Sequence, residues 1–208
     1  MEYPDWVCVT TKGICIFRAS LIGAHFFNFG GILMELITTK QYIGAKEAYE
    51  QMECLCESMM HRPLYDFCAN GIDLKEILRR DTTDFLLCLS ACDKELTFCE
   101  KEVITGLTKS RLLYDDMKKR IIDKKLTSKE FRRSVPEILC ILVSADLPLL
   151  GLGKTYGKAY FSTMLLSLFK LVGDIVISQD NNISETERET YKEYISNMDK
   201  YITLYCLL

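Results

Sequence analysis

The sequence predicts an all-α protein, and two observations carry this prediction. Apolar residues recur at intervals of three and four along most of the chain, which is the spacing of one helix face. Two stretches of eight residues, 93–100 and 180–187, follow one pattern that suits the end of a helix, a turn and the start of the next helix. We therefore expect residues 71–208 to form a helical bundle of two pseudo-repeated helix-turn-helix units, with residues 1–70 as an N-terminal extension packed on it.

The repeated pattern contains its own signals for starting a helix. Each copy reads Asp, two variable residues, an aliphatic residue, a hydroxyl residue, two more residues and Glu. The hydroxyl residue, Thr97 or Ser184, can cap the helix that follows. Glu100 or Glu187 then stands at the third helical position, where its carboxylate can bond back to the cap residue. Each copy thus predicts a capping box.

The first 70 residues give weaker signals. Residues 6–17 alternate around a glycine-containing turn and predict a short β-hairpin. Residues 19–34 are uncharged but include His25, Asn28 and three glycines, and they are short for a membrane span of about 20 apolar residues. A buried helix or hairpin is favoured there, with membrane insertion as the alternative. From residue 39 a helical pattern runs to Met59, before Pro63.

Between residues 71 and 107 the sequence predicts three helices. Asp73 can cap a short helix that ends at Arg80, and Thr83 or Asp84 can open the helix that leads into the first repeated stretch. A further helix should run from the first capping box to Leu107.

Residues 109–133 form the one basic stretch, with ten Lys or Arg against four Asp or Glu. Apolar residues recur at helical spacing within it, so we expect them to point inward and most of the charge to be solvated; they are Leu112, Leu113, Met117, Ile121 and Ile122. A phosphate-binding or RNA-binding face is the alternative, although no aromatic residue sits among the lysines to stack on bases.

The last 75 residues predict three more helices. Pro136 suits the first turn of a helix that ends at Asp146. A loop over residues 147–158 follows, then an apolar helix over residues 160–177. The second capping box opens the final helix, whose tyrosines, Ile195 and Met198 form one stripe.

The repeated pattern resembles the Asp-Gly-x-Ile-Ser-x-x-Glu signature of TerB-like domains, an all-helical family related to the tellurite-resistance protein TerB. The chain has Lys94 and Asn181 where the family has glycine. The resemblance implies a non-enzymatic, cytoplasmic protein-interaction module in a bacterial stress-response or defence assembly. Its partners would be other proteins, sometimes at the inner face of the membrane.

The resemblance also implies a divalent-cation site made by the acidic residues of both motifs. Carried over by motif position, its ligands would be Asp93, Glu100, Asp180 and Glu187. Hard oxygen ligands suit Ca²⁺ or Mg²⁺. The alternative is purely structural, since capping already accounts for the two glutamates.

Composition and charge limit the other classes. With 26 basic and 29 acidic side chains, the net charge of −3 gives no global argument for nucleic acid or an anionic membrane. The sequence opens without a signal-peptide pattern, so we expect a reducing cytoplasm and treat the ten cysteines as small buried residues. A soft-metal or redox site of Cys88, Cys92 and Cys99 is the alternative.

Catalytic signals are few. The two histidines, His25 and His61, stand in no nucleophile motif, and Gly151–Thr155 lacks the first glycine of a phosphate-binding loop because Pro148 takes its place. Two functions remain as alternatives to the interaction module. One is an immunity or antitoxin protein that binds and blocks a toxin, and the other is a metal-dependent enzyme that uses the acidic residues.

Overall fold

The computed structural model describes residues 7–10, 13–16, 39–61, 71–92, 96–151, 160–178 and 184–206. The chain divides into two compact units, Met1–Gly31 and Ile32–Leu208. The first unit contains the antiparallel strands β1 (Val7–Thr10) and β2 (Gly13–Ile16), in which Cys8 lies opposite Cys15. Residues 19–34, for which a buried helix or hairpin is predicted, lie outside the described part of the chain.

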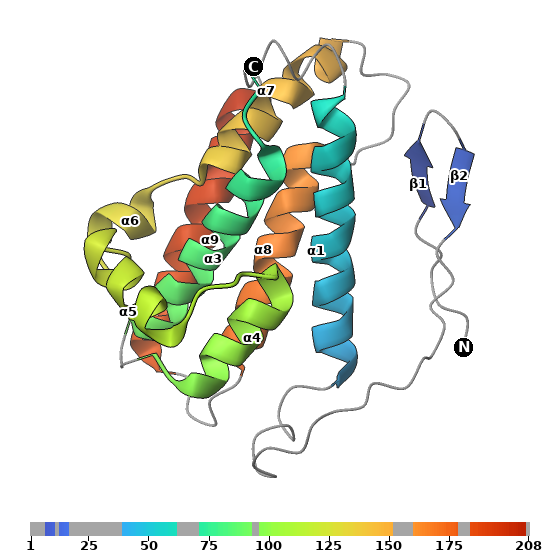
Figure 1. The fold of residues 1–208 in the computed structure, drawn as a ribbon. Coiled ribbons are helices and arrows are strands. Elements are labelled where there is room, and N and C mark those ends of the chain that lie inside the picture. The colour runs from blue at the N-terminus through green and yellow to red at the C-terminus, as the bar shows by residue number, and fades with distance from the viewer. Residues whose placement is uncertain are drawn as a thin grey trace. The chain divides into compact units, whose positions relative to one another are not determined.

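The second unit is helical, which confirms the all-α class. Its long helices run side by side, and two shorter ones lie at one side of them (Figure 1). The helices are α1 (Thr39–Met60), α3 (Leu74–Ala91), α4 (Phe98–Thr108), α5 (Tyr114–Asp123), α6 (Lys129–Arg133), α7 (Glu137–Gly151), α8 (Phe161–Ile177) and α9 (Glu185–Cys206). The domain boundary expected after residue 70 falls inside this unit, because α1 belongs to it. None of the described helices is long and apolar enough to cross a membrane.

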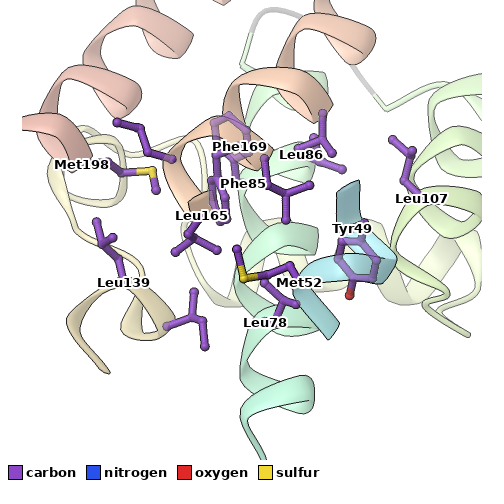
Figure 2. Packing of buried hydrophobic residues seen from close by; sticks show 14 of the residues in the cluster. Tyr49, Met52, Leu78, Phe85, Leu86, Leu107, Leu139, Leu165, Phe169 and Met198 are labelled. Atoms are coloured by element: carbon purple, nitrogen blue, oxygen red, sulfur yellow. The ribbon is translucent and has the colours of Figure 1, made fainter. Parts of the chain in front are cut away.

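Helix α3 lies at the centre of the bundle. It packs against α1, α4, α5, α7, α8 and α9, and every residue from Asp81 to Ser90 is buried, so this part of the helix is covered on all sides. The Phe85 ring lies 5.1 Å from the Phe169 ring of α8 and 4.7 Å from the Tyr194 ring of α9. Figure 2 shows Phe85 and Phe169 together among the apolar side chains of the core.

The predicted break in α3 is wrong, because one helix runs from Leu74 to Ala91. The expected cap at its start is confirmed, since the Asp73 carboxylate accepts the N–H groups of Lys75 and Glu76 at 2.9 and 3.2 Å. Thr83 and Asp84 have the chemistry of cap residues, but both are buried within the helix and bond to other elements. Thr83 donates to the Thr108 hydroxyl at 3.3 Å, and Asp84 pairs with cations of the α5 region.

The inward stripe predicted for the basic stretch is only partly correct. Met117 is fully buried, but Leu113 and Ile122 are 69% and 74% exposed. Leu113 precedes the helix as its N-cap. Ile122 comes five residues after Met117, which at 3.6 residues per turn places it about 140° around the helix. Leu126, in the turn after α5, is buried instead.

Helix α7 continues beyond its predicted end at Asp146 and reaches Gly151. Pro148 within it lacks an N–H group, which removes one helical hydrogen bond without ending the helix here. The side chain of Asp146 is fully buried and reaches the start of α8, where it accepts the N–H groups of Phe161 and Ser162, both at 3.0 Å, and the Ser162 hydroxyl at 2.6 Å. The aspartate thus caps a neighbouring helix.

Candidate functional site

Of the four predicted cation ligands, the structure describes only the two glutamates. Asp93 and Asp180 lie outside the described residues. Glu100 and Glu187 are 8% and 3% exposed and stand in the first turns of α4 and α9. Within the described ranges, no three or more His, Cys, Asp or Glu side chains are grouped to hold a metal ion. The cation site therefore stays a prediction.

The capping geometry expected for these glutamates is confirmed. Glu100 accepts the N–H group of Thr97 at 2.7 Å, and its own N–H group donates to the Thr97 hydroxyl at 3.2 Å. The N–H group of Ser184 donates to Glu187 at 3.4 Å, and the N–H group of Glu187 donates to the Ser184 hydroxyl at 3.0 Å. Capping gives both buried carboxylates a structural role.

The alternative site of Cys88, Cys92 and Cys99 receives no geometric support from the described residues. Cys88 is buried, and burial raises the pKa of its thiol to about 12, so it stays protonated at neutral pH and is a poor nucleophile or metal ligand. Cys92 and Cys99 are half-buried, and the Cys92 thiol donates to the Leu89 carbonyl at 3.1 Å. His61 is exposed at the end of α1, and His25 lies outside the described part.

A basic groove is the most developed candidate site in the described structure. It is a hollow of about 520 Å³ between α3, the connection from α4 to α5, and α5 itself. Its lining residues are Glu76, Arg79, Arg80, Thr83, Lys109, Ser110, Arg111, Leu112 and Arg120. Five of these nine are Lys or Arg and one is acidic, so the groove concentrates positive charge in a protein whose net charge is −3.

The α3 wall of the groove follows from helical spacing. Glu76, Arg79, Arg80 and Thr83 are three, four and seven positions apart, so they share one face of the helix. The opposite face of α3 carries core residues such as Phe85. One helix therefore supplies both the bundle core and a wall of the groove.

The second wall depends on the way α4 ends. Lys109 adopts a left-handed backbone conformation with φ of 53°, which terminates α4 and turns the chain toward α5. Its ammonium group lies 2.8 Å from Glu53 and 3.4 Å from Glu50, both on α1. The hydrogen bond to Glu53 raises the pKa of Lys109, so the side chain is charged at neutral pH. This turn places residues 109–112 beside α3.

Two of the arginines are held in place by buried carboxylates. Arg80 binds Asp81 at 2.8 Å and Glu137 at 2.6 Å, whereas Arg120 binds Asp84, which also binds Lys124 at 2.8 Å. The side chains of Asp81 and Asp84 are each 8% exposed. Because breaking a buried ion pair leaves an uncompensated charge, these two guanidinium groups are fixed parts of the fold.

Asp81 also ties the groove to the neighbouring helix α7. Its second carboxylate oxygen accepts the N–H group of Ile138 at 2.9 Å, near the α7 N-terminus. Burial raises the pKa of the Asp81 carboxyl, although the hydrogen bonds from Ile138 and Arg80 act in the opposite direction. Asp81 on α3 thus binds both Arg80 on its own helix and the backbone of α7.

The other three cations lie at the rim. Arg79 is 40% exposed and pairs with Glu76, which is 59% exposed, and Lys109 is 47% exposed. Arg111 is exposed and makes no ion pair with any described residue. Exposed pairs contribute only about 0–1 kcal/mol, so an incoming anion can replace Glu76 as the partner of Arg79 at little cost.

Three of the five cations in this groove belong to the basic stretch that is evident in the sequence. The basic stretch 109–133 includes Lys109, Arg111 and Arg120. Arg79 and Arg80 stand about 30 residues upstream on another helix, and only packing brings them to the same hollow. Their signal in the sequence is weak, since two adjacent arginines on a helix usually form a solvated face.

The chain was also compared with known proteins. Models of protein families, curated proteins and solved structures give no match to this chain.

Proposed function

We propose that this chain is a non-enzymatic protein-interaction module that binds an acidic segment of another protein in the basic groove. The observation that carries the proposal is the convergence of five Lys or Arg side chains from α3, the α4–α5 connection and α5 on one hollow of about 520 Å³. Pockets of about 300–1,000 Å³ enclose small ligands, so the hollow suits a few residues of an extended segment.

The surroundings of the groove favour a short acidic segment over nucleic acid. Proteins that bind single strands combine a basic track with aromatic side chains on which bases stack, and no Phe, Tyr or Trp is among the lining residues. Carboxylates also border the cations, including Glu50, Glu53 and Glu76. They would repel a long phosphate backbone, whereas a short segment can place its charges on the rim cations only.

The TerB-like resemblance suggests the biological setting. By that resemblance, the module would act in the cytoplasm, within a bacterial stress-response or defence assembly. The resemblance rests on the repeated motifs at 93–100 and 180–187, which are separate in sequence from the groove. The groove and the repeated motifs are therefore independent features of the chain.

The test is binding of a fluorescein-labelled peptide rich in Asp and Glu, followed by fluorescence anisotropy with the full chain. Arg79→Glu and Arg111→Glu should each weaken binding by about tenfold or more, because each replaces an attraction with a repulsion. Added salt should weaken binding to the wild-type chain, since exposed charges are screened.

Arg188→Glu provides a matched control. Arg188 is exposed on α9, is no part of the groove lining, and makes no ion pair with a described residue. This variant makes the same change in net charge and should bind the peptide like the wild-type chain. Equal weakening in all three variants, or no weakening in the two groove variants, would refute the proposal.

A further inference from the structure

The hydrogen-bond donors of the groove suggest a more specific ligand than a carboxylate. Arg79 and Arg111 each carry a planar guanidinium group, and Lys109, whose ammonium group pairs with Glu50 and Glu53 of α1, lines the same hollow. The hydroxyl oxygen of Ser110 accepts the N–H group of Leu112 at 3.4 Å, which leaves the hydroxyl proton to donate elsewhere. These four donor-bearing side chains line the hollow together with Arg80, Thr83 and Arg120, and three of the four are cationic.

We propose that the groove recognises a phosphoryl group carried on a peptide segment of the partner protein. Arg79, Lys109 and Arg111 would neutralise its charge and Ser110 would donate a hydrogen bond to it. This inference rests on the proposed function, because it names the chemical group within the acidic segment.

Charge and shape favour a phosphoryl group over a carboxylate. A phosphomonoester carries a charge of about −1.5 to −2 at neutral pH and three acceptor oxygens, whereas a carboxylate carries one charge and two oxygens. Guanidinium groups bind phosphate through paired hydrogen bonds, and such charge-assisted bonds are stronger than those between neutral groups. A phosphoryl group thus offers these four donor side chains one more acceptor oxygen and more negative charge than a carboxylate does.

The arrangement of ion pairs leaves these particular donors available. Arg80 and Arg120 are committed to Asp81 and Asp84, whose side chains are each 8% exposed. The Arg79–Glu76 pair joins exposed side chains and exchanges readily. The Lys109–Glu50 pair joins side chains that are 47% and 46% exposed, whereas Glu53, the second partner of Lys109, is only 19% exposed and holds that ammonium group more firmly. Glu76 is the one carboxylate in the lining, and it would swing away from Arg79 as the phosphoryl group binds.

The experiment uses two peptides of one acidic sequence, with either serine or phosphoserine at the centre, and measures binding to the full chain by anisotropy. The phosphopeptide should bind about tenfold or more tightly, as expected for added charge-assisted hydrogen bonds. Arg111→Gln and Ser110→Ala should each reduce this preference, and Arg188→Gln should preserve it. Inorganic phosphate should compete with the phosphopeptide at millimolar concentration.

The outcomes separate this inference from the function on which it rests. If both peptides bind equally and still depend on Arg79 and Arg111, the phosphoryl inference is overturned and the acidic-segment function is kept. If neither peptide binds, both proposals fail. If a short RNA oligomer binds more tightly than the phosphopeptide, with the same dependence on Arg111, the groove is a nucleic-acid site and both proposals are again wrong.

Discussion

The close packing around Gly173 on α8 predicts that replacing this glycine lowers the stability of the fold. The hydrogen that replaces a side chain there faces the rings of Tyr191 from α9 and Phe85 from α3. A Cβ atom at this position would lie 2.6 Å from Cε2 of Tyr191 and 3.1 Å from Cζ of Phe85. The first distance is far below van der Waals contact, so Gly173→Ala requires a ring to move.

The magnitude follows from two opposing effects. Alanine stabilises a helix interior by about 0.5–1 kcal/mol relative to glycine, whereas forcing an extra carbon into a packed core costs about 1–3 kcal/mol. Phe85 is fully buried between Phe169 and Tyr194 and cannot shift alone. Tyr191 is half-buried and donates to the Lys170 carbonyl at 3.3 Å, a bond that its displacement would break. We expect a net loss of about 1–2 kcal/mol in the free energy of unfolding.

Gly44→Ala is the matched control for the helix-propensity effect. Gly44 is exposed within α1, and a Cβ atom there would meet nothing within 4 Å. This variant should gain about 0.5–1 kcal/mol. Both can be measured by urea denaturation followed through the helical circular dichroism signal. A Gly173→Ala variant that is as stable as the wild-type chain, or more stable, would contradict the close packing of α3, α8 and α9 at this glycine.

Two further predictions concern carboxylates. Burial raises the pKa of Asp146 above its ordinary value of 3.8, although the hydrogen bonds from Phe161 and Ser162 oppose this. Because the folded state holds this proton more tightly than the unfolded state, the contribution of Asp146 to stability is greatest below pH 3.8 and is lost as the pH rises through the raised pKa. The free energies of unfolding of the wild-type chain and Asp146→Asn should therefore be measured from pH 3 to pH 7. As the pH rises, the value of the wild-type chain should fall relative to that of the variant. A difference that stays constant with pH would contradict this expectation. For the predicted cation site, calorimetric titration of chelator-treated protein with Ca²⁺ and Mg²⁺ should show saturable binding that is lost in a folded Asp93→Asn/Asp180→Asn variant, whereas titrations without heat would leave Glu100 and Glu187 as helix caps alone.

Local signals explain which parts of the fold the sequence could predict. The caps at Asp73, Thr97 and Ser184 were predictable, because each capping side chain bonds to a backbone within three residues of itself. The start of α8 at Phe161 and the end of α1 at Met60 lie within one residue of their predicted positions, since both follow from apolar periodicity. These features need no knowledge of the tertiary structure.

The wrong predictions concern side chains whose partners lie far away in the sequence. Asp84 reads as a helix cap in sequence, but its partners Arg120 and Lys124 stand 36 and 40 residues away, and their charges let it sit inside a helix. Asp146 reads as the end of a helix but caps another one, 15 and 16 residues further on. A short polar side chain has the same local chemistry in either role. Only the packing of the helices decides which backbone or cation it meets.

The groove was only half predictable for the same reason, and its construction has a consequence for function. Its inner cations, Arg80 and Arg120, are bound to Asp81 and Asp84 on the helix that also carries the centre of the core. Changing them would disturb the fold, so loss of binding in such variants would say little about the site. The rim residues Arg79 and Arg111 make either an exposed ion pair or none with the described residues, so their charge can be reversed while the bundle stays intact. Binding and stability are therefore separable at the rim, and it is there that the function of the groove can be tested.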